Sequence, residues 1–445
     1  MNKTLLTDLY QLTMNAAYAD NDKDDVATFD LFIRKLPKDW GYFIANGIED
    51  AIDYITNVKF DDAEIVYLKE QGMFKERFLE SLKDFKFEGD VYVIKEGTPI
   101  APNTPILRVT AKRTQAQFLE TTLLNIINFQ TMIATKANRV VNAAKNKTVV
   151  DFGLRRAQGE DAGMLGARAS YLAGAVATSN VKAGKEYGIP ISGTHAHSFV
   201  MSFPNEIDSF RAYVKTFPDN ATLLIDTYNT VQGARNAAVV AKELEAKGKK
   251  LGAVRLDSGD LAELSKMVRN VLDENGLNYV KIIASNDLNE YKIDELIKNY
   301  ARIDGFGVGT EMITAKPVAA LSGVYKLVSD KDGDKIKLSA EKCTYPGKKQ
   351  VYRIKDEFGN YAHDVLALDS EKIDGMPLLE KVVENGKRTA ARRGLEEIRQ
   401  YALDCVTKLP KNAKAINAAV PYGIRISKGL EKLVHDLTNK HEGGN

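Results

Sequence analysis

The spacing of apolar residues in the first hundred positions predicts several types of element. The spacing is helical over 5–19, alternates as in a strand over 26–34, and indicates a polar helix over 61–84. Residues 87–111 contain short strand-like runs separated by Gly-Thr-Pro and Pro-Asn-Thr-Pro turns. We therefore expect an N-terminal α+β domain with a sandwich-like build over residues 1–112.

A regular alternation of strands and helices is predicted further along the chain. Thr114 and Gln117 match a capping box, and a long apolar helical pattern follows them to about Ala144. Short apolar runs come next, at 148–153, 189–197 (the weakest), 222–228, 251–260, 279–287 and 303–310. Helix-like segments separate them, for example 163–178, 229–247, 260–275 and 288–299. This order predicts parallel βα units with right-handed crossovers.

Polar residues gather where these apolar runs end. In parallel α/β folds, ligands bind at the edge formed by the carboxyl ends of the strands. Side chains from six strand ends converge most readily if the sheet closes on itself. We therefore expect a fold of the α/β class, with an irregular (β/α) barrel over residues 113–325.

The pattern loosens after the expected barrel. Asp-Gly and Phe-Gly-Asn turns predict hairpins, and helices are expected at about 391–405 and near the C-terminus. Residues 326–445 are therefore expected to form a C-terminal α+β region that packs on the other two.

Composition and charge narrow the class of protein. The chain is 44% hydrophobic and 27% charged, as globular proteins are, and its 62 Lys and Arg nearly balance 60 Asp and Glu. A net charge of +2 gives no reason to expect a nucleic acid or a membrane surface as partner. The two cysteines, Cys343 and Cys405, lack CxxC spacing, and no apolar run reaches 18 residues. We expect a cytoplasmic protein that uses local charge clusters to bind small anions.

Two strand ends carry arginines suited to such anions. Arg255 and Asp257 share one face of a strand end, and Asp260 begins the next helix, a set that could bind an anion, sugar hydroxyls and Mg²⁺. Alternatively, the set is a structural ion pair with Asp260 as a helix cap. Arg155 and Arg156 follow another strand and suit phosphate or carboxylate, although a solvated helix face explains Arg156 equally well.

Small residues end two further strands. Gly309 follows a Gly-Phe-Gly-Val run and would let backbone N–H groups approach a phosphate, with the hydroxyl of Thr310 beside it. Ser285 and Asn286 offer small donors at another strand end, or a helix cap. The sequence contains neither GxxxxGK[ST] nor GxGxxG, so a P-loop and a dinucleotide fingerprint are not expected.

His195 and His197 allow three interpretations. On an extended strand they would share a face, as in the HxH zinc pair of some barrel hydrolases, but the remaining histidines lie outside the expected barrel, at His363, His435 and His441. They could also form a structural hydrogen-bonded pair. The third interpretation is a nucleophilic or acid–base histidine.

Seven segments in this order resemble the nicotinate phosphoribosyltransferase family, over nearly the whole chain. They are TDLYQLTM (7–14), FDLFIRKLP (29–37), DFGLRRAQG (151–159), GTHAHSF (193–199), RLDSGDL (255–261), GVGT (307–310) and GVYKLV (323–328). The resemblance implies a type II phosphoribosyltransferase that works as a homodimer, with an irregular α/β barrel and a sandwich-like domain. It further implies that nicotinate and phosphoribosyl pyrophosphate (PRPP) give nicotinate mononucleotide and pyrophosphate with Mg²⁺, and that ATP hydrolysis is coupled through a transient phosphohistidine.

The same resemblance implies roles for individual residues. His197 matches the phosphorylated histidine of the family, and Arg255 and Thr194 match its nicotinate contacts. Tyr10 matches a nicotinate contact that is donated across the dimer interface, and Thr310 matches a residue at the PRPP phosphate. Catalytic roles are expected for His197, Asp257 and Arg255. Motif position and chemistry add further expected substrate contacts, namely Arg155, Asp260, Ser285, Asn286 and Gly309.

Other functions are weighed against this one. Nicotinamide-using enzymes would not need Arg255 and carry an acidic residue soon after Gly-Thr, whereas quinolinate-using enzymes are much shorter and lack the histidine element. A zinc-dependent barrel hydrolase would use His195 and His197. A non-catalytic metabolite-binding barrel is the third alternative. It is the least attractive, because it gives no role to so many polar residues at the strand ends.

Overall fold

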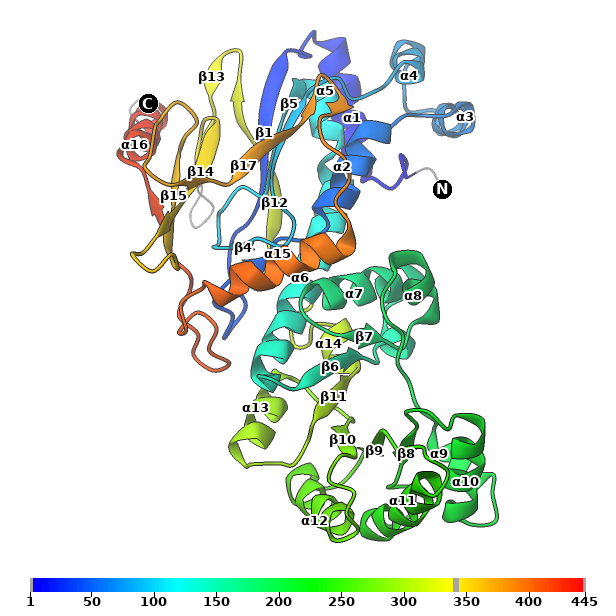
Figure 1. The fold of residues 1–445 in the computed structure, drawn as a ribbon. Helices are drawn as coiled ribbons and strands as arrows, with labels where there is room; N and C mark the ends of the chain where they lie inside the picture. The colour runs from blue at the N-terminus through cyan, green and yellow to red at the C-terminus, as the bar shows by residue number, and fades with distance from the viewer. Residues whose placement is uncertain (1–2, 339–343, 443–445) are drawn as a thin grey trace. The chain divides into compact units, whose positions relative to one another are not determined.

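The computed structural model describes residues 3–338 and 344–442, and the chain divides into two compact units (Figure 1). The first unit joins residues 1–132 to 320–445, so both ends of the chain belong to it, and the second unit is 133–319. The three sequence regions expected above, and the packing of 326–445 on the other two, stay predictions. Cys343 lies outside the described residues.

The first unit contains an antiparallel sheet. Among the described residues its strand order is β13-β12-β1-β5-β3-β17-β18. The bounds are β1 (Val26–Ile33), β3 (Asp90–Ile94), β5 (Leu107–Lys112), β12 (Gly323–Asp330), β13 (Gly333–Asp334), β17 (Leu379–Glu384) and β18 (Lys387–Arg388). All but the first residue of β1 is buried, because β1 lies inside the sheet between β12 and β5.

A second sheet of the first unit packs against the first. Its order is β16-β14-β15-β19, and β2 pairs with β4 separately. The bounds are β2 (Phe43–Ile44), β4 (Pro99–Ile100), β14 (Lys349–Lys355), β15 (Tyr361–Leu368), β16 (Met376–Pro377) and β19 (Ile424–Ile426). Lys349 of β14 pairs with Asp30 of β1 at 2.9 Å, and both side chains are buried. Arg108 of β5 donates to the carbonyl of Lys349 at 2.8 Å. These buried contacts between sheets confirm the sandwich-like build.

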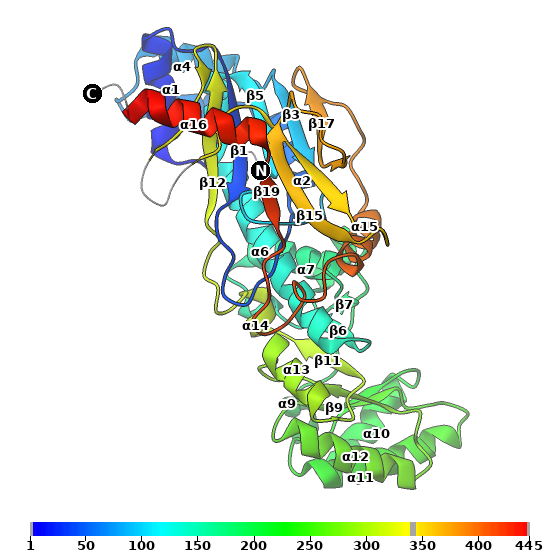
Figure 2. The same cartoon turned by 90° about the vertical axis from the view of Figure 1, so that its left-hand side faces the viewer.

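Helices surround these sheets and correct two predictions. They are α1 (Leu9–Asp20), α2 (Ile48–Asn57), α3 (Asp62–Glu70), α4 (Glu76–Lys83), α5 (Arg113–Phe118), α15 (Leu395–Thr407) and α16 (Lys428–Glu442), the last of which packs beside β15 (Figure 2). The single helix predicted over 61–84 is two helices, separated at Gly72, whose φ is +69°. The capping box at Thr114 is wrong, because its N–H and hydroxyl both donate to Asp24 and the helix has already begun.

The second unit is built on a parallel sheet of order β7-β6-β11-β10-β9-β8. The strands are β6 (Thr148–Asp151), β7 (Ala177–Thr178), β8 (Thr222–Leu224), β9 (Ala253–Leu256), β10 (Lys281–Ala284) and β11 (Gly305–Val308). Five were predicted as apolar runs. Strand β7 was missed because its two residues lie inside the segment predicted as helical, 163–178.

Helices accompany these strands on the outside of the sheet (Figure 1). They are α7 (Glu160–Leu172), α8 (Val181–Tyr187), α9 (His197–Met201), α10 (Glu206–Thr216), α11 (Thr230–Glu245), α12 (Leu261–Glu274), α13 (Glu290–Lys298), α14 (Thr310–Ile313) and a short 3₁₀ helix η1 (Leu154–Arg156). The long helix α6 (Glu120–Ala144) contains the boundary between the two units.

An irregular segment links the two outermost strands of the parallel sheet. Ile191 makes an isolated parallel bridge to Thr178 of β7. A few residues later, Nε2 of His195 accepts a hydrogen bond from the backbone N–H of Leu224 in β8, at 3.2 Å. The weak sequence run at 189–197 therefore contacts both edge strands, through one bridge and one side chain instead of a ladder, and the six strands curl into a half-barrel. This confirms the irregular barrel.

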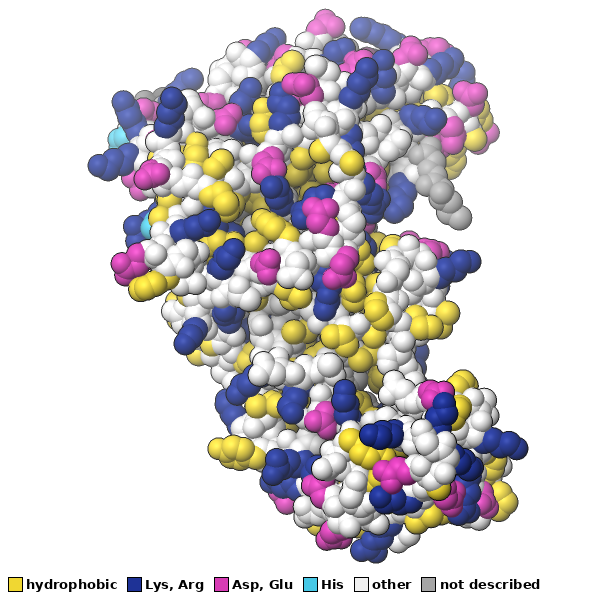
Figure 3. Space-filling model, in the orientation of Figure 1, with side chains coloured by type: hydrophobic (Ala, Val, Ile, Leu, Met, Phe, Trp, Pro, Cys, Tyr) yellow, Lys and Arg dark blue, Asp and Glu magenta, His cyan; other side chains and the backbone are white. Residues whose placement is uncertain are grey.

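Positively and negatively charged side chains are interspersed on the surface. Lys and Arg side chains alternate with Asp and Glu over the face shown in Figure 3 and do not form one large basic patch there. Within the two described ranges, no helix has the length and apolarity to cross a membrane.

Candidate active site

A cavity of about 370 Å³ lies at the carboxyl ends of the barrel strands. Its wall includes five residues predicted from the sequence: Arg155, Thr194, His197, Arg255 and Asp257. They come from the ends of β6 and β9 and from the segment that links β7 to β8. The strand-end placement agrees with the edge at which parallel α/β folds bind ligands.

Arg255 is held by protein contacts on most of its donors. Its Nε donates to Ser285 at 2.9 Å, and its Nη1 donates to the hydroxyl of Thr194 at 2.7 Å and toward the carbonyl of His195 at 3.5 Å. Its Nη2 donates to Asp257 at 3.0 Å. An arginine has five N–H groups. One N–H of Nη2 therefore remains for a ligand.

Asp257 is fixed on several sides. Its Oδ1 accepts from Arg255 and from the hydroxyl of Ser285. Its backbone N–H donates to Asp226 at 2.7 Å. Burial alone would raise the pKa of the Asp257 carboxyl, but the Ser285 hydroxyl and the positive charge of Arg255 outweigh burial and lower that pKa. Asp257 is therefore ionised near neutral pH.

Ser285 lies behind the cavity wall, buried between the two charged residues that it bridges. The sequence placed it among the substrate contacts. In the structure its hydroxyl orients Arg255 and Asp257, and its predicted contact with substrate stays a prediction.

His197 is the first residue of α9, and its side chain is 40% exposed. Its Nδ1 lies 3.1 Å from the hydroxyl of Thr227, and its Nε2 lies 3.8 Å from Oδ2 of Asp257. The ring is therefore placed between a hydroxyl and a carboxylate while part of it faces the cavity.

His195 has a structural environment. Its ring packs against Phe199, Phe210 and Tyr213, and its Nε2 is used by the Leu224 N–H. Burial lowers the pKa of His195 to about 4. One ring nitrogen of His195 is thus engaged by the backbone, and no three His, Cys, Asp or Glu side chains group as metal ligands within residues 3–338 and 344–442.

The aromatic wall of the cavity comes from Phe152, which the sequence analysis did not select. The Arg255 guanidinium carbon lies 5.8 Å from the centroid of its ring. A Cβ at Gly307 would lie 2.4 Å from Cε2 of that ring. At least one glycine of the β11 run is thus needed to make room for Phe152.

Comparison with known proteins decides the family. The chain matches the model of the nicotinate phosphoribosyltransferase N-terminal domain over residues 5–128, the family model over 148–361 and the C-terminal domain model over 373–434. The chain belongs to the nicotinate phosphoribosyltransferase family.

Individual relatives are similar along the whole chain. A nicotinate phosphoribosyltransferase of Mycobacterium tuberculosis is 41% identical over 448 residues, which cover 99% of this chain and 96% of the relative. One of Bacillus subtilis is 41% identical, covering 96% and 93%. The crystal structure of human nicotinic acid phosphoribosyltransferase matches with a TM-score of 0.86 at 28% identity, covering 97% of this chain and 99% of that one.

Other predicted residues of this family member lie apart from the cavity. Asp260 accepts from the N–H groups of Ala262 and Glu263 and caps α12, as the structural alternative stated. Asp260 and Asn286 line a different cavity of about 710 Å³. Their substrate contacts stay predictions.

The remaining predicted contacts are also untested. Gly309 and Thr310 follow β11 but are not part of the 370 Å³ cavity wall. Tyr10 lies on α1 of the first unit and is 45% exposed. Arg156 is exposed and stands outside that wall, whereas Arg155 is exposed within it.

Sequence reasoning missed Asp226 and Thr227. Both come shortly after β8, behind Ile225, in a run whose polar end was noted without choosing residues from it. The signal that selected Arg255 and Asp257, a polar residue immediately after an apolar run, was present here too. The sequence alone does not show which other side chain each of these residues contacts.

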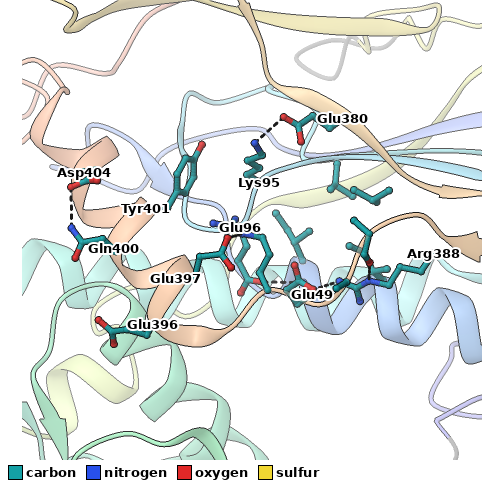
Figure 4. A pocket seen from close by; sticks show the side chains of 17 residues that line it. Glu49, Lys95, Glu96, Glu380, Arg388, Glu396, Glu397, Gln400, Tyr401 and Asp404 are labelled. Carbon is teal, nitrogen blue, oxygen red and sulfur yellow. Dashed lines mark hydrogen bonds and ion pairs between the residues drawn. The ribbon is translucent and has the colours of Figure 1, made fainter.

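The first unit has a larger cavity of about 840 Å³ that is less suited to the reaction of this family. Its wall includes α2, α15, β3 and β17 (Figure 4). Charged groups there pair with one another: Lys95 with Glu380 at 3.1 Å, and Arg388 with Glu49. None of the residues that we predicted to bind substrate lines the described part of this wall.

Proposed function

We propose that this chain joins nicotinate to PRPP, giving nicotinate mononucleotide and pyrophosphate for NAD biosynthesis, at the cavity beside β9. One observation carries the proposal: the Arg255 cluster and the Phe152 ring face the same cavity. A cation beside an aromatic face suits a planar ring that bears a carboxylate.

The chemistry needs stabilisation of charge more than a strong base. The pyridine nitrogen attacks C1 of the ribose with its own lone pair while the bond from C1 to the pyrophosphate oxygen breaks. The transition state resembles an oxocarbenium ion, and negative charge develops on the leaving group. Arg155, exposed in the cavity wall, is placed to bind an anionic group of PRPP.

The remaining N–H and the positive charge of Arg255 support nicotinate over nicotinamide as the substrate. Its one remaining Nη2 N–H and its positive charge favour a carboxylate, which accepts only, over a neutral amide. Four contacts hold the guanidinium before a substrate arrives, so little side-chain entropy remains to be lost on binding.

ATP coupling through His197 is part of the proposal. The partly exposed imidazole would take the γ-phosphoryl group: an N–P bond forms, the bond from Pγ to the ADP oxygen breaks, and water later releases phosphate. The added dianion would lie beside Asp257 and change the electrostatics of the cavity.

Magnesium would arrive mainly with the phosphates. The carboxylate oxygens of Asp257 and Asp226 are the kind of donor that Mg²⁺ prefers, and sites of this type commonly use one or two carboxylates plus substrate phosphates. The bound cation would offset charge on the leaving pyrophosphate. We also propose a cytoplasmic homodimer in which Tyr10 completes the site of its partner.

The test is conversion of nicotinate plus PRPP to the mononucleotide, with and without ATP, using nicotinamide and quinolinate as competing substrates. We expect product from nicotinate, more of it with ATP, and His197→Ala should abolish labelling by γ-³²P-ATP. Product from nicotinamide in place of nicotinate would overturn the substrate, and persistent label in His197→Ala would overturn the phosphorylated residue.

A further inference from the structure

Asp151 is a buried carboxyl next in the chain to the aromatic wall of the cavity. It is the last residue of β6 and is 1% exposed. Its Oδ1 accepts from the N–H of Gly153 at 2.8 Å, and its Oδ2 accepts from the hydroxyl of Thr178 at 2.7 Å. Its backbone carbonyl accepts from the N–H of Ser179 at 2.8 Å. Three acceptor atoms of one residue therefore hold both the turn after β6 and the end of β7.

The two segments that Asp151 holds both contribute to the wall of the 370 Å³ cavity. Phe152 comes directly before Gly153, and Arg155 comes from the short helix η1 that Gly153 begins. Ser179 comes from the second segment. A Cβ at residue 153 would lie 2.9 Å from Oδ1 of Asp151, closer than such contacts normally come, so glycine lets this turn approach the carboxyl.

The hydroxyl of Thr178 connects the two segments. It is buried, donates to Asp151, and accepts from the N–H of Asn180 at 3.0 Å. A methyl group in its place would leave Oδ2 of Asp151 and the N–H of Asn180 without this partner. We infer that Thr178 and Asp151 are positioning residues whose hydrogen bond fixes the turn at Gly153 and thereby holds the Phe152 ring at the cavity.

Strand β11 bounds the same ring from another side. The N–H of Phe152 donates to the carbonyl of Val308 at 2.8 Å, and a Cβ at Gly307 would lie 2.4 Å from Cε2 of the ring. The ring therefore has little free space on the β11 side. A shift of the turn at Gly153 must change the contact between the ring and Gly307.

The inference deepens the proposed function, on which its consequence for catalysis rests. Phe152 is the aromatic face proposed to lie against the nicotinate ring, and a face that is fixed before the substrate arrives loses less entropy on binding. Thr178 is absent from the described cavity wall. Its hydroxyl would therefore act on nicotinate through Phe152.

Selective labelling can report on the turn without any activity. When ¹³C-carbonyl phenylalanine is combined with ¹⁵N-glycine, a carbonyl–nitrogen correlation spectrum shows only glycines that follow a phenylalanine. The sequence has three of them, Gly153, Gly307 and Gly359. Phe152→Leu and Phe358→Leu each delete one signal, because the preceding carbonyl is then unlabelled, and so assign all three.

Each signal reports a different feature. The Gly153 signal reports the hydrogen bond to Asp151. The Gly307 signal reports the position of the Phe152 ring, because the ring current depends on the distance to the ring. Gly359 lies in an exposed turn of the first unit and is the internal reference.

Variants of Thr178 isolate the hydroxyl. Thr178→Val should move the Gly153 and Gly307 signals and leave the Gly359 signal in place. Thr178→Ser keeps a hydroxyl and should return both signals toward their wild-type positions. Wild-type positions of both signals in a folded Thr178→Val chain would overturn the inference.

Two further variants complete this experiment. Thr114→Val is the matched control, because the Thr114 hydroxyl also donates to an aspartate at 2.7 Å, Asp24, in the first unit, and its loss should move none of the three signals. Asp151→Asn breaks the same hydrogen bond from the other end and should move the same two signals as Thr178→Val. It keeps the test decisive if Thr178→Val does not fold, since unmoved signals in Asp151→Asn also refute the role.

A kinetic measurement separates this inference from the proposed function. Thr178→Val should raise the KM for nicotinate about tenfold, the size of one hydrogen bond, and Thr178→Ser should restore it. In a Phe152→Leu background the same change should add nothing, because the ring through which it acts is gone. An equal increase in both backgrounds would overturn the action through Phe152. If the signals move as expected but the wild-type chain converts no nicotinate, the proposed function fails and the positioning of the turn stands.

Discussion

Arg255 is the residue on which recognition of a carboxylate depends. Replacing it with lysine keeps the charge but cannot reproduce a fork that contacts Ser285, Thr194 and Asp257 together. We expect Arg255→Lys and Arg255→Ala to raise the KM for nicotinate by about 30- to 150-fold, equivalent to ~2–3 kcal/mol.

Steady-state kinetics with nicotinate as the varied substrate measure this effect. Arg156→Ala is the matched control, because Arg156 is exposed outside the cavity wall, and it should behave as wild type. Thermal unfolding of each variant separates loss of binding from loss of fold. Unchanged KM in a folded Arg255→Ala protein would remove Arg255 from the carboxylate site.

His195 makes stability depend on pH. Its folded pKa of about 4 lies below the ordinary value of 6.5, so between those values the unfolded chain binds more protons than the folded chain. Stability is fully present above pH 6.5 and is lost as pH falls toward 4. The loss amounts to about 3 kcal/mol.

His195→Gln offers an uncharged acceptor to the same Leu224 N–H and removes this titration. Denaturant unfolding from pH 7 to pH 4 should therefore show a shallower loss of unfolding free energy in the variant than in wild type. Parallel pH profiles for the two proteins would mean that His195 takes up its proton in the folded state.

A buried ion pair joins α6 to α13. Nζ of Lys136 pairs with Glu290 and donates to the carbonyl of Lys316 at 2.7 Å, and the side chains of the pair are each 1% exposed. Removing one partner leaves a buried charge, although Arg139 still contacts Glu290 at 3.2 Å. We expect Lys136→Met to lower the unfolding free energy by about 3 kcal/mol.

Denaturant unfolding checks this value against Lys182→Met, which breaks an exposed pair with Glu160 and should lower the unfolding free energy far less. The double variant Lys136→Met/Glu290→Gln should lose further stability, because it also takes the carboxylate partner from the buried Arg139. Equal losses in the two single variants would show that burial does not strengthen the Lys136 pair.

Elements with a strong local pattern were predictable. Strands β6, β9, β10 and β11 are apolar runs that end in polar residues, because buried parallel strands need apolar side chains and the ligand edge needs polar ones. Strand β7 has two residues, too few for any pattern. The break at Gly72 was missed because one glycine is tolerated inside many helices.

Long-range partners were not predictable from local sequence. Thr114 fits a helix cap by its neighbours, yet its hydroxyl bonds to Asp24, 90 residues earlier. The contacts of Thr227 with His197 and of Asp226 with Asp257 span about 30 residues in the same way. Single-sequence patterns identify which side chains are polar at a strand end, and only the fold determines which of them meet.

For the whole molecule, the proposed homodimer predicts complementation between inactive chains. If Tyr10 acts on the partner's site, a mixture of Tyr10→Ala and His197→Ala chains forms hybrids in which one of two sites has both wild-type residues. Half of the dimers would be hybrids, so activity should recover to about a quarter of wild type.

The measurement is activity after the two variants are co-refolded or co-expressed, with each variant alone as the control. Sedimentation equilibrium establishes the oligomeric state of each sample. Dimers without recovered activity would place Tyr10 in the site of its own chain, or in none.

The way the first unit is assembled has a consequence for the time course of its synthesis. Strand β1 finds its antiparallel partner in β12, where Ile33 lies opposite Gly323. A ribosome adding roughly 5–20 residues per second needs about 15–60 s to pass from one to the other. Throughout that interval the nascent β1 has an open edge, while the inserted barrel can already collapse behind it. Chaperones that shield strand edges should therefore matter more for the yield of this chain than for that of its isolated barrel.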